Sequence, residues 1–343
     1  MNNYTCIVTK IRAMQKNILK DEDYDRLSKF KSMPELVEFL KNHPTYAPYF
    51  SNMNPAIVHR SEIEKRLYRA YNNEFTKIYK FADLNTRKYL KAFAFNFVVL
   101  FIKKSMHSLY MGNTSDIDQT PLHEFFKHYT KFDPAKLLES NNLTELIEAL
   151  NGTEIYAQMK HIYDTTGDQL IFFETFLDSY MFKKLWNLKF NLLNQDDIRY
   201  IRKVYGTTID LINISTIYRS KKYYNLHDSS IIPFLIPINY KLTKDDINSM
   251  LHAEDLKACI DAISHTKYSY IIPELEHRTI GSVISDVIKK VQKQSVHQCA
   301  YSFATIGAFF YARQQEILYL ISVTEGIRYN IGSKEIKKFL TKY

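Results

Sequence analysis

The chain is poor in the residues that interrupt regular structure. Of its 343 residues, only 8 are glycine and 9 are proline. Because tight turns between strands depend largely on these two residues, their scarcity disfavours a β-rich fold and favours helices joined by short loops. An apolar content of 45% is typical of a globular protein, and no long low-complexity tract indicates disorder.

Cysteine is also sparse, and its spacing is uninformative. The three cysteines, Cys6, Cys259 and Cys299, show no paired arrangement. An odd and scattered set provides neither a disulfide framework nor a cysteine-based metal site. It is typical of a protein that resides in a reducing cytoplasm.

Long hydrophobic runs are missing. The two longest are Ala92–Ile102, which Asn96 interrupts, and Ala300–Ala312. Both are well short of the roughly 20 apolar residues that a membrane-spanning helix needs. The first residues also lack the apolar core of a signal peptide. The sequence therefore predicts a soluble, cytoplasmic protein that could still sit on a membrane complex.

The motifs of common active sites are absent too. Neither a Walker A loop nor a GxGxxG loop occurs, so we do not expect the chain to hydrolyse ATP. His123 and His128 are five residues apart, which would place them about 140° apart around a helix and prevent both from binding one metal. Asp116 and Asp118 lack the further oxygen ligands of a calcium loop. We predict no catalytic, cofactor-binding or metal-binding residue.

The net charge is moderately positive. The chain has 46 Lys and Arg against 37 Asp and Glu, which gives +9. Such a balance favours acidic partners, although the basic residues are scattered as on ordinary solvated helix faces. The run Arg219–Tyr224 interleaves basic and aromatic residues, as single-strand binders do, but no recognised nucleic-acid module surrounds it. The basic C-terminal turn of a helix is the better interpretation, and we expect no nucleic acid.

Helical periodicity dominates what is present. Three short amphipathic segments have apolar residues on one face: Ser32–Leu40, Asn142–Leu150 and Glu254–Ile263. The first opens with the spacing of a capping box, from Ser32 to Glu35. The pair Asp196 and Asp197 is typical of a helix start, where the dipole favours negative charge.

The sequences that follow these three segments are similar. Each is followed by a short polar stretch, a nearby threonine and a tyrosine: Tyr46, Tyr156 or Tyr268. The intervals between the tyrosines are 110 and 112 residues, which suggests three copies of one helical unit. The predicted repeats are residues 1–115, 116–240 and 241–343.

The order of elements after each tyrosine supports the repeat. An acidic residue lies 18 positions beyond each tyrosine: Glu64, Glu174 and Asp286. A second helix then carries an acidic residue in each copy: Asp83, Asp210 and Glu316. The polar stretches Met111–Thr120 and Asn225–Lys244 are candidate boundaries. Within the second, Ile231–Ile238 could form a strand, but its two prolines favour a packed, extended connector.

The segment Tyr311–Gly326 resembles the C-terminal signature of the C subunit of V/A-type (vacuolar/archaeal-type) ATPases, a relative of the d subunit of the eukaryotic V-ATPase. Four residues match this signature in register: Glu316, Ile317, Leu320 and Gly326. Tyr319 and Ile321 replace the usual Asn and Arg, so the resemblance does not carry over the polar contacts that those two side chains make in the family.

Other segments agree with the same family. Lys10–Met14 is similar to the opening of the family, Ile209–Arg219 resembles the motif of the second repeat, and Asn85–Lys91 looks like a degraded first-repeat version. The resemblance marks seven positions: Arg12, Asn85, Asp210, Asn213, Arg219, Glu316 and Gly326. Packing and capping within each repeat and contact with partners remain alternative roles for them.

The resemblance implies an all-α fold of three similar helical domains, arranged with pseudo-threefold symmetry into a funnel. It implies a non-catalytic central-stalk (rotor) subunit that links the central shaft to the membrane proteolipid ring. Such a subunit transmits torque for ATP-coupled proton or sodium transport, with one copy per complex on the cytoplasmic face of the membrane. It would contact the membrane only through the ring. It would be monomeric when isolated and need no cofactor. The alternatives are a helical-repeat scaffold or a nucleic-acid-binding protein unrelated to the ATPase.

Overall fold

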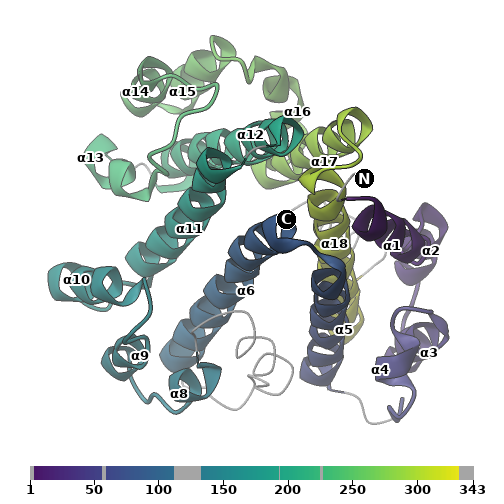
Figure 1. Ribbon diagram of the computed structural model, residues 1–343. Coiled ribbons are helices and arrows are strands. Elements are labelled where there is room, and N and C mark those ends of the chain that lie inside the picture. Colours follow the sequence, from purple (N-terminus) through teal and green to yellow (C-terminus); the bar gives the residue numbers. More distant parts are fainter. Residues whose placement is uncertain (1–3, 56–58, 112–132, 193, 225–226, 332–343) are drawn as a thin grey trace. The chain divides into compact units, whose positions relative to one another are not determined.

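The computed structural model describes residues 4–55, 59–111, 133–192, 194–224 and 227–331. Throughout these ranges the regular elements are helices, and no strand occurs in them (Figure 1). The prediction of an all-α fold is confirmed.

The contacts divide the chain into two compact units. Unit 1 comprises Met1–Arg87 and Thr279–Tyr343, and unit 2 comprises Lys88–Arg278. The predicted division into three repeats, with boundaries at residues 115 and 240, is a different grouping of the same helices and stays a prediction.

Unit 1 is built around its last long helix, α18. Its helices are α1 (Thr5–Gln15), α2 (Asp21–Leu27), α3 (Met33–Asn42), α4 (Ala47–Phe50), α5 (Arg60–Phe81), α17 (Ile280–Gln298) and α18 (Phe303–Arg328). Helix α18 packs against α1, α3, α5 and α17, so side chains on every side of it are buried. This explains why the run Ala300–Ala312 carries no charge.

Unit 2 is built in the same manner around α12. Its helices are α6 (Leu84–Met111, which begins in unit 1), α8 (Pro134–Leu138), α9 (Leu143–Ala149), α10 (Tyr156–Thr166), α11 (Leu170–Asn187), η2 (Leu188–Asn191), α12 (Gln195–Arg219), η3 (Ser220–Tyr224), α13 (Asp228–Ile231), η4 (Ile232–Phe234), α14 (Lys244–Leu251), α15 (Leu256–Ser264), η5 (Ser269–Ile271) and α16 (Ile272–Leu275). Helix α12 contacts α11, α14 and α15.

The predicted helix starts are confirmed, with one difference in capping. Asn142 caps α9 and Asp255 caps α15 through side chains that accept backbone N–H groups. Asn194 caps α12 in the same way, directly before Asp196. Ser32 precedes α3 as expected, but its hydroxyl donates to the carboxylate of Glu35 (2.9 Å) instead of accepting a backbone N–H.

The segment between α13 and α14 is a connector, as predicted, and not a strand. Residues 232–234 form a single 3-10 turn, after which residues 235–242 run without regular secondary structure to the cap of α14 at Thr243. The connector is therefore less extended at its start than the two prolines suggested.

Two further sequence predictions concern membranes and the polar segment after α6. In the described ranges, no helix is both long enough and apolar enough to cross a membrane. The predicted boundary at 112–120 and the side chains of Asp116, Asp118, His123 and His128 lie outside the described residues.

Candidate functional site

The carboxylate of Glu316 is fully buried in unit 1. It accepts the backbone N–H of Leu19 (2.8 Å) and the hydroxyl of Tyr46, and it forms an ion pair with Arg313 (2.5 Å). Burial raises the pKa of the Tyr46 hydroxyl well above its ordinary value, so this group stays protonated and donates. The donors come from three different parts of the chain and meet on one side chain of α18.

Arg313, one turn earlier on α18, completes the arrangement. Its side chain is 1% exposed and pairs with Glu74 of α5 (Nε to Oε2 2.8 Å, Nη2 to Oε1 2.9 Å). It also donates to the carbonyl of Asn17 and the hydroxyl of Thr45, each at 3.2 Å. We call these residues the Glu316 cluster: Asn17, Leu19, Thr45, Tyr46, Glu74, Arg313 and Glu316.

The charges of this cluster do not cancel. One guanidinium faces two carboxylates, and the backbone N–H and the tyrosine hydroxyl supply the remaining stabilisation of the second negative charge. Burial raises the pKa of Glu74, whereas Arg313 acts in the opposite direction. Arg313 is therefore the group on which both buried carboxylates depend.

In unit 2, the carboxylate of Asp210 of α12 is fully buried. It accepts the backbone N–H groups of Tyr240 (3.2 Å), Lys241 (2.7 Å) and Leu242 (3.1 Å) and the hydroxyl of Tyr268 (2.7 Å). Burial raises the pKa of Asp210, and these four hydrogen bonds oppose that shift. We call these five residues the Asp210 cluster.

The two clusters fasten the same kind of segment. Leu19 lies just before α2 and Tyr46 just after α3, so Glu316 holds both ends of the α2–α3 pair on α18. Leu242 and Tyr268 occupy the same places around α14 and α15, and Asp210 holds them on α12. One helical pair is thus tied at both ends to one acidic side chain in each unit.

The first helix of each tied pair, α2 in unit 1 and α14 in unit 2, also begins with the same kind of cap. The N–H of Lys20 is bonded to Asp23 (2.9 Å) at the start of α2, and the N–H of Thr243 is bonded to Asp246 (2.8 Å) at the start of α14. The sequence pattern marked the tyrosines and the acidic residues separately but did not show that they pair. The signal that could have found the pairing is the constant placement of an aromatic hydroxyl after each short helix.

The tyrosine of the middle predicted repeat, Tyr156, does not bind a buried carboxylate. Tyr156 is only half-buried, and its hydroxyl donates to Glu148 of the adjacent α9 (2.8 Å). Lys160 completes this exposed group by pairing with Glu148 (2.8 Å). Two of the three tyrosines therefore bind a buried carboxylate of a long helix, and the middle one does not.

Asn213 and Gly206 extend the attachment of the connector along α12. The amide of Asn213, also fully buried, binds both the N–H (2.8 Å) and the carbonyl (2.9 Å) of Ile236. Gly206 lies against the ring of Tyr240 so closely that a Cβ atom there would be 2.5 Å from its Cγ. The connector is thus held by Asn213 and Asp210 and presses on Gly206.

The remaining marked positions are not part of these clusters. Arg12 is exposed on α1, 5.6 Å from the ring of Tyr301. Asn85 and Arg219 are exposed near the start of α6 and at the end of α12. Gly326 is buried in the last turn of α18.

The basic and aromatic run after α12 is the end of a helix, as predicted. Residues 220–224 continue α12 as a short π-helical turn. The side chain of Lys221 is 7% exposed there and pairs with Asp228 (3.1 Å), while the ammonium of Lys222 lies 5.3 Å from the ring of Tyr218. These cations therefore contribute to local packing.

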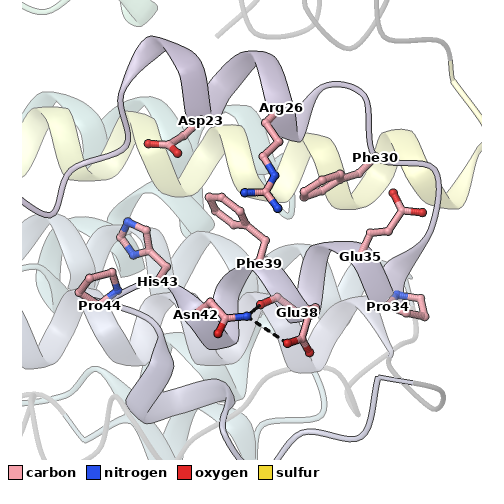
Figure 2. Close-up of a pocket in the computed structure, with 10 residues that line it drawn as sticks. All are labelled: Asp23, Arg26, Phe30, Pro34, Glu35, Glu38, Phe39, Asn42, His43 and Pro44. Carbon is pink, nitrogen blue, oxygen red and sulfur yellow. Dashed lines mark hydrogen bonds between the residues drawn. The ribbon is translucent and has the colours of Figure 1, made fainter.

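A pocket of about 560 Å³ lies between α2 and α3 (Figure 2). The guanidinium of Arg26 lies over the rings of Phe30 (6.0 Å) and Phe39 (5.6 Å). The carboxylates of this pocket are hydrogen-bonded to neighbours in their own helices or caps: Asp23, Glu35 and Glu38. The carboxylates of the pocket are thus engaged in local hydrogen bonds. In the described ranges, no group of three His, Cys, Asp or Glu is placed to hold a metal.

Comparison with known proteins extends over nearly the whole chain. Among curated relatives, the C subunit of the A-type ATP synthase of Methanosphaera stadtmanae is 23% identical over 350 residues, which cover 98% of this chain and 87% of that protein. The protein of the same name from Methanocaldococcus jannaschii is 22% identical over 352 residues, covering 98% and 86%. The one from Methanothermobacter thermautotrophicus is 22% identical over 300 residues, covering 86% and 74%. The model of the ATP synthase (C/AC39) subunit family matches residues 7–339, a range that includes both clusters, and the chain therefore belongs to this family.

Proposed function

We propose that this chain is a non-catalytic central-stalk subunit of a V/A-type rotary ATPase. It links the central shaft to the proteolipid ring of the membrane and transmits torque for ATP-coupled proton or sodium transport. The observation that carries the proposal is the family match over residues 7–339, together with curated relatives named as the C subunit of A-type ATP synthase, which match over most of their own length.

The buried clusters fit a mechanical role. A linker that carries torque needs parts that move as one body, and close-packed helices have low compressibility. In each unit a buried carboxylate ties a helical pair to a long, largely buried helix at two points. Separating the pair from that helix would leave a buried charge without its donors, which is costly in free energy.

The repeated attachment also supports the proposed architecture of three helical repeats in a pseudo-threefold funnel. The segments Leu19–Tyr46 and Leu242–Tyr268 are tied alike, and Tyr156 occupies the corresponding sequence position in between. We propose one copy per complex, on the cytoplasmic face of the membrane, with the shaft and the ring as partners. The net charge of +9 suits acidic surfaces on either partner.

The proposal is tested by affinity purification of the tagged chain from detergent-solubilised membranes of its own source, followed by mass spectrometry. We expect a small ring-forming proteolipid together with shaft and nucleotide-binding subunits. The control is an equally tagged, unrelated helical protein expressed in the same cells. A second measurement removes the chain from purified complexes. We expect ATP hydrolysis by the catalytic head to persist while ATP-driven ion transport is lost, and added chain to restore that transport.

Two results would contradict the proposal. One is recovery of none of these subunits from membranes shown to contain the ATPase, which would favour an unrelated helical scaffold. The other is full ATP-driven transport by complexes that lack the chain, because a linker between shaft and ring cannot be dispensable for coupling.

A further inference from the structure

One end of unit 1 exposes large apolar side chains beside cations. Leu84 is 78% exposed and Phe81 is 53% exposed at the turn from α5 to α6. Tyr301, 42% exposed, lies in the turn from α17 to α18. Exposed apolar side chains of this size are ordinary one by one, but a group of them beside cations indicates a contact surface.

Helix α1 contacts both of these turns through two cationic side chains. The ammonium of Lys10 lies 5.4 Å from the centre of the Phe81 ring, and the guanidinium of Arg12 lies 5.6 Å from that of Tyr301. Ile11, between the two cations, is fully buried, which anchors α1 in the unit. We call this surface the α1 patch: Lys10, Arg12, Phe81, Leu84 and Tyr301.

The segments that carry the patch contain mostly positive charge. The segments 5–15, 80–87 and 299–303 contain Lys10, Arg12, Lys80 and Arg87 but a single acidic residue, Asp83. The carboxylate of Asp83 accepts the backbone N–H of Thr86 (2.8 Å) and so caps the start of α6. A partner that contacts this surface therefore meets cations and apolar groups, and the one carboxylate, that of Asp83, is already hydrogen-bonded.

We propose that the α1 patch binds the headgroup region of an anionic phospholipid membrane. Membrane interfaces favour aromatic side chains at headgroup depth, and each nearby Lys or Arg adds attraction to anionic lipid. Cores of protein–protein interfaces are instead depleted of lysine, whereas this patch includes Lys10 over the ring of Phe81, and Lys80 directly precedes Phe81 in the chain. The combination of Phe81, Leu84 and these cations matches the chemistry of a headgroup layer over apolar chains.

Unit 2 shows the same combination independently at the turn from α11 to α12. The ammonium of Lys189 lies 3.1 Å from the centre of the Trp186 ring and 4.6 Å from that of Phe190. Phe190 is 73% exposed. A cation held over an exposed aromatic ring thus recurs at a second helical-hairpin turn, which supports a shared type of contact.

The proposal is tested by co-sedimentation of the full chain with vesicles. Vesicles of phosphatidylcholine alone are compared with vesicles that contain about 30% phosphatidylserine, at low and at high salt. We expect binding to the anionic vesicles only, and weaker binding at high salt because screening shortens the range of the attraction. The double substitution Phe81→Ser with Leu84→Ser leaves the charge unchanged and should weaken binding at least about tenfold, since both side chains are already exposed and their loss spares the core.

A matched pair of variants separates the patch from the overall positive charge. Arg12→Gln with Tyr301→Ser should weaken binding about tenfold, of which removal of the cation accounts for about fivefold. The control is Arg328→Gln with Tyr329→Ser, which removes an equivalent cation–aromatic pair (5.3 Å) at the other end of α18, roughly 40 Å away. We expect the control to bind as the unaltered chain does.

Equal losses in both variants would overturn the proposal, because binding would then follow net charge alone. Equal binding to neutral and anionic vesicles, or no binding to either, would also overturn it and leave an acidic protein as the occupant of the patch. Direct lipid binding goes beyond the family resemblance, which implies membrane contact only through the ring. These outcomes do not affect the proposed role between shaft and ring, which the purification and coupling experiments test separately.

Discussion

Arg313 offers the sharpest test of how unit 1 is held together. In Arg313→Met the side chain keeps a similar length and can fill the same space, but Glu74 and Glu316 lose the cation between them. Removing one partner of a buried ion pair typically costs about 3–5 kcal/mol. We therefore expect the free energy of unfolding of unit 1 to fall by about that amount and its thermal midpoint to fall by roughly 6–20 °C.

A double-mutant cycle isolates the electrostatic part of this loss. Glu74→Leu alone leaves Arg313 paired with Glu316 and should cost less than Arg313→Met. The double variant removes one charge of each sign, and Glu316 retains its bonds from Leu19 and Tyr46. It should therefore be more stable than Arg313→Met alone, with a coupling energy of about 1–3 kcal/mol.

The pH dependence provides a further criterion. Burial already raises the pKa of Glu74, and loss of Arg313 removes the group that opposes this shift. Glu74 should therefore take up a proton more readily in Arg313→Met. The difference in the free energy of unfolding between this variant and the unaltered chain should then shrink as the pH falls towards 5. The measurement is denaturant unfolding followed by circular dichroism at several pH values. A loss below about 1 kcal/mol, or a double variant no better than Arg313→Met, would refute the role assigned to the buried guanidinium.

Further substitutions test residues that lie beside the clusters. Gly206→Ala should destabilise unit 2 by about 1–2 kcal/mol despite the higher helix propensity of alanine, because its Cβ would meet the ring of Tyr240. With Tyr240→Ala as background, the same change should become neutral or stabilising in denaturant unfolding; an unchanged penalty would exclude the ring as its cause. Burial lowers the pKa of His43, so its contribution to stability is complete above about pH 6.5 and is lost as the pH falls through that value towards the lower pKa of the folded state. Unfolding midpoints between pH 8 and 5 should show this loss, and His43→Gln should abolish it; an identical slope in that variant would contradict the assignment.

The helices could be predicted from the sequence because their signals are local. The apolar periodicity of Asn142–Leu150 and the acidic start at Asp196 depend on residues within one or two turns of each other. The connector before α14 was predictable for the same reason, from two prolines four residues apart. Its single 3-10 turn was not, because this turn packs against α11, a helix distant along the chain.

The clusters could not be predicted because their partners are distant along the chain. Glu316 binds Leu19 and Tyr46, which are 297 and 270 positions away, and nothing in either local sequence shows the pairing. The family resemblance marked Glu316 but left open whether it packs internally or contacts a partner. Arg313 was not marked at all, although an arginine among the apolar residues of a buried helix is the kind of residue that requires a buried partner.

The two clusters reach one mechanical result by different chemistry. Asp210 is held by four uncharged donors and needs no cation, whereas Glu316 shares its site with a second carboxylate and therefore needs Arg313. What the two sites share is the placement of the bonds, at the entry and the exit of a two-helix segment, with all of them converging on the most buried helix of the unit. A force applied to that segment passes to the helix through hydrogen bonds to a buried charge, which are short-ranged and directional, and not only through dispersion contacts, which yield by sliding. For a chain proposed to carry torque, this placement accounts for the presence of charged side chains in the core of a protein whose other interior residues are mainly apolar.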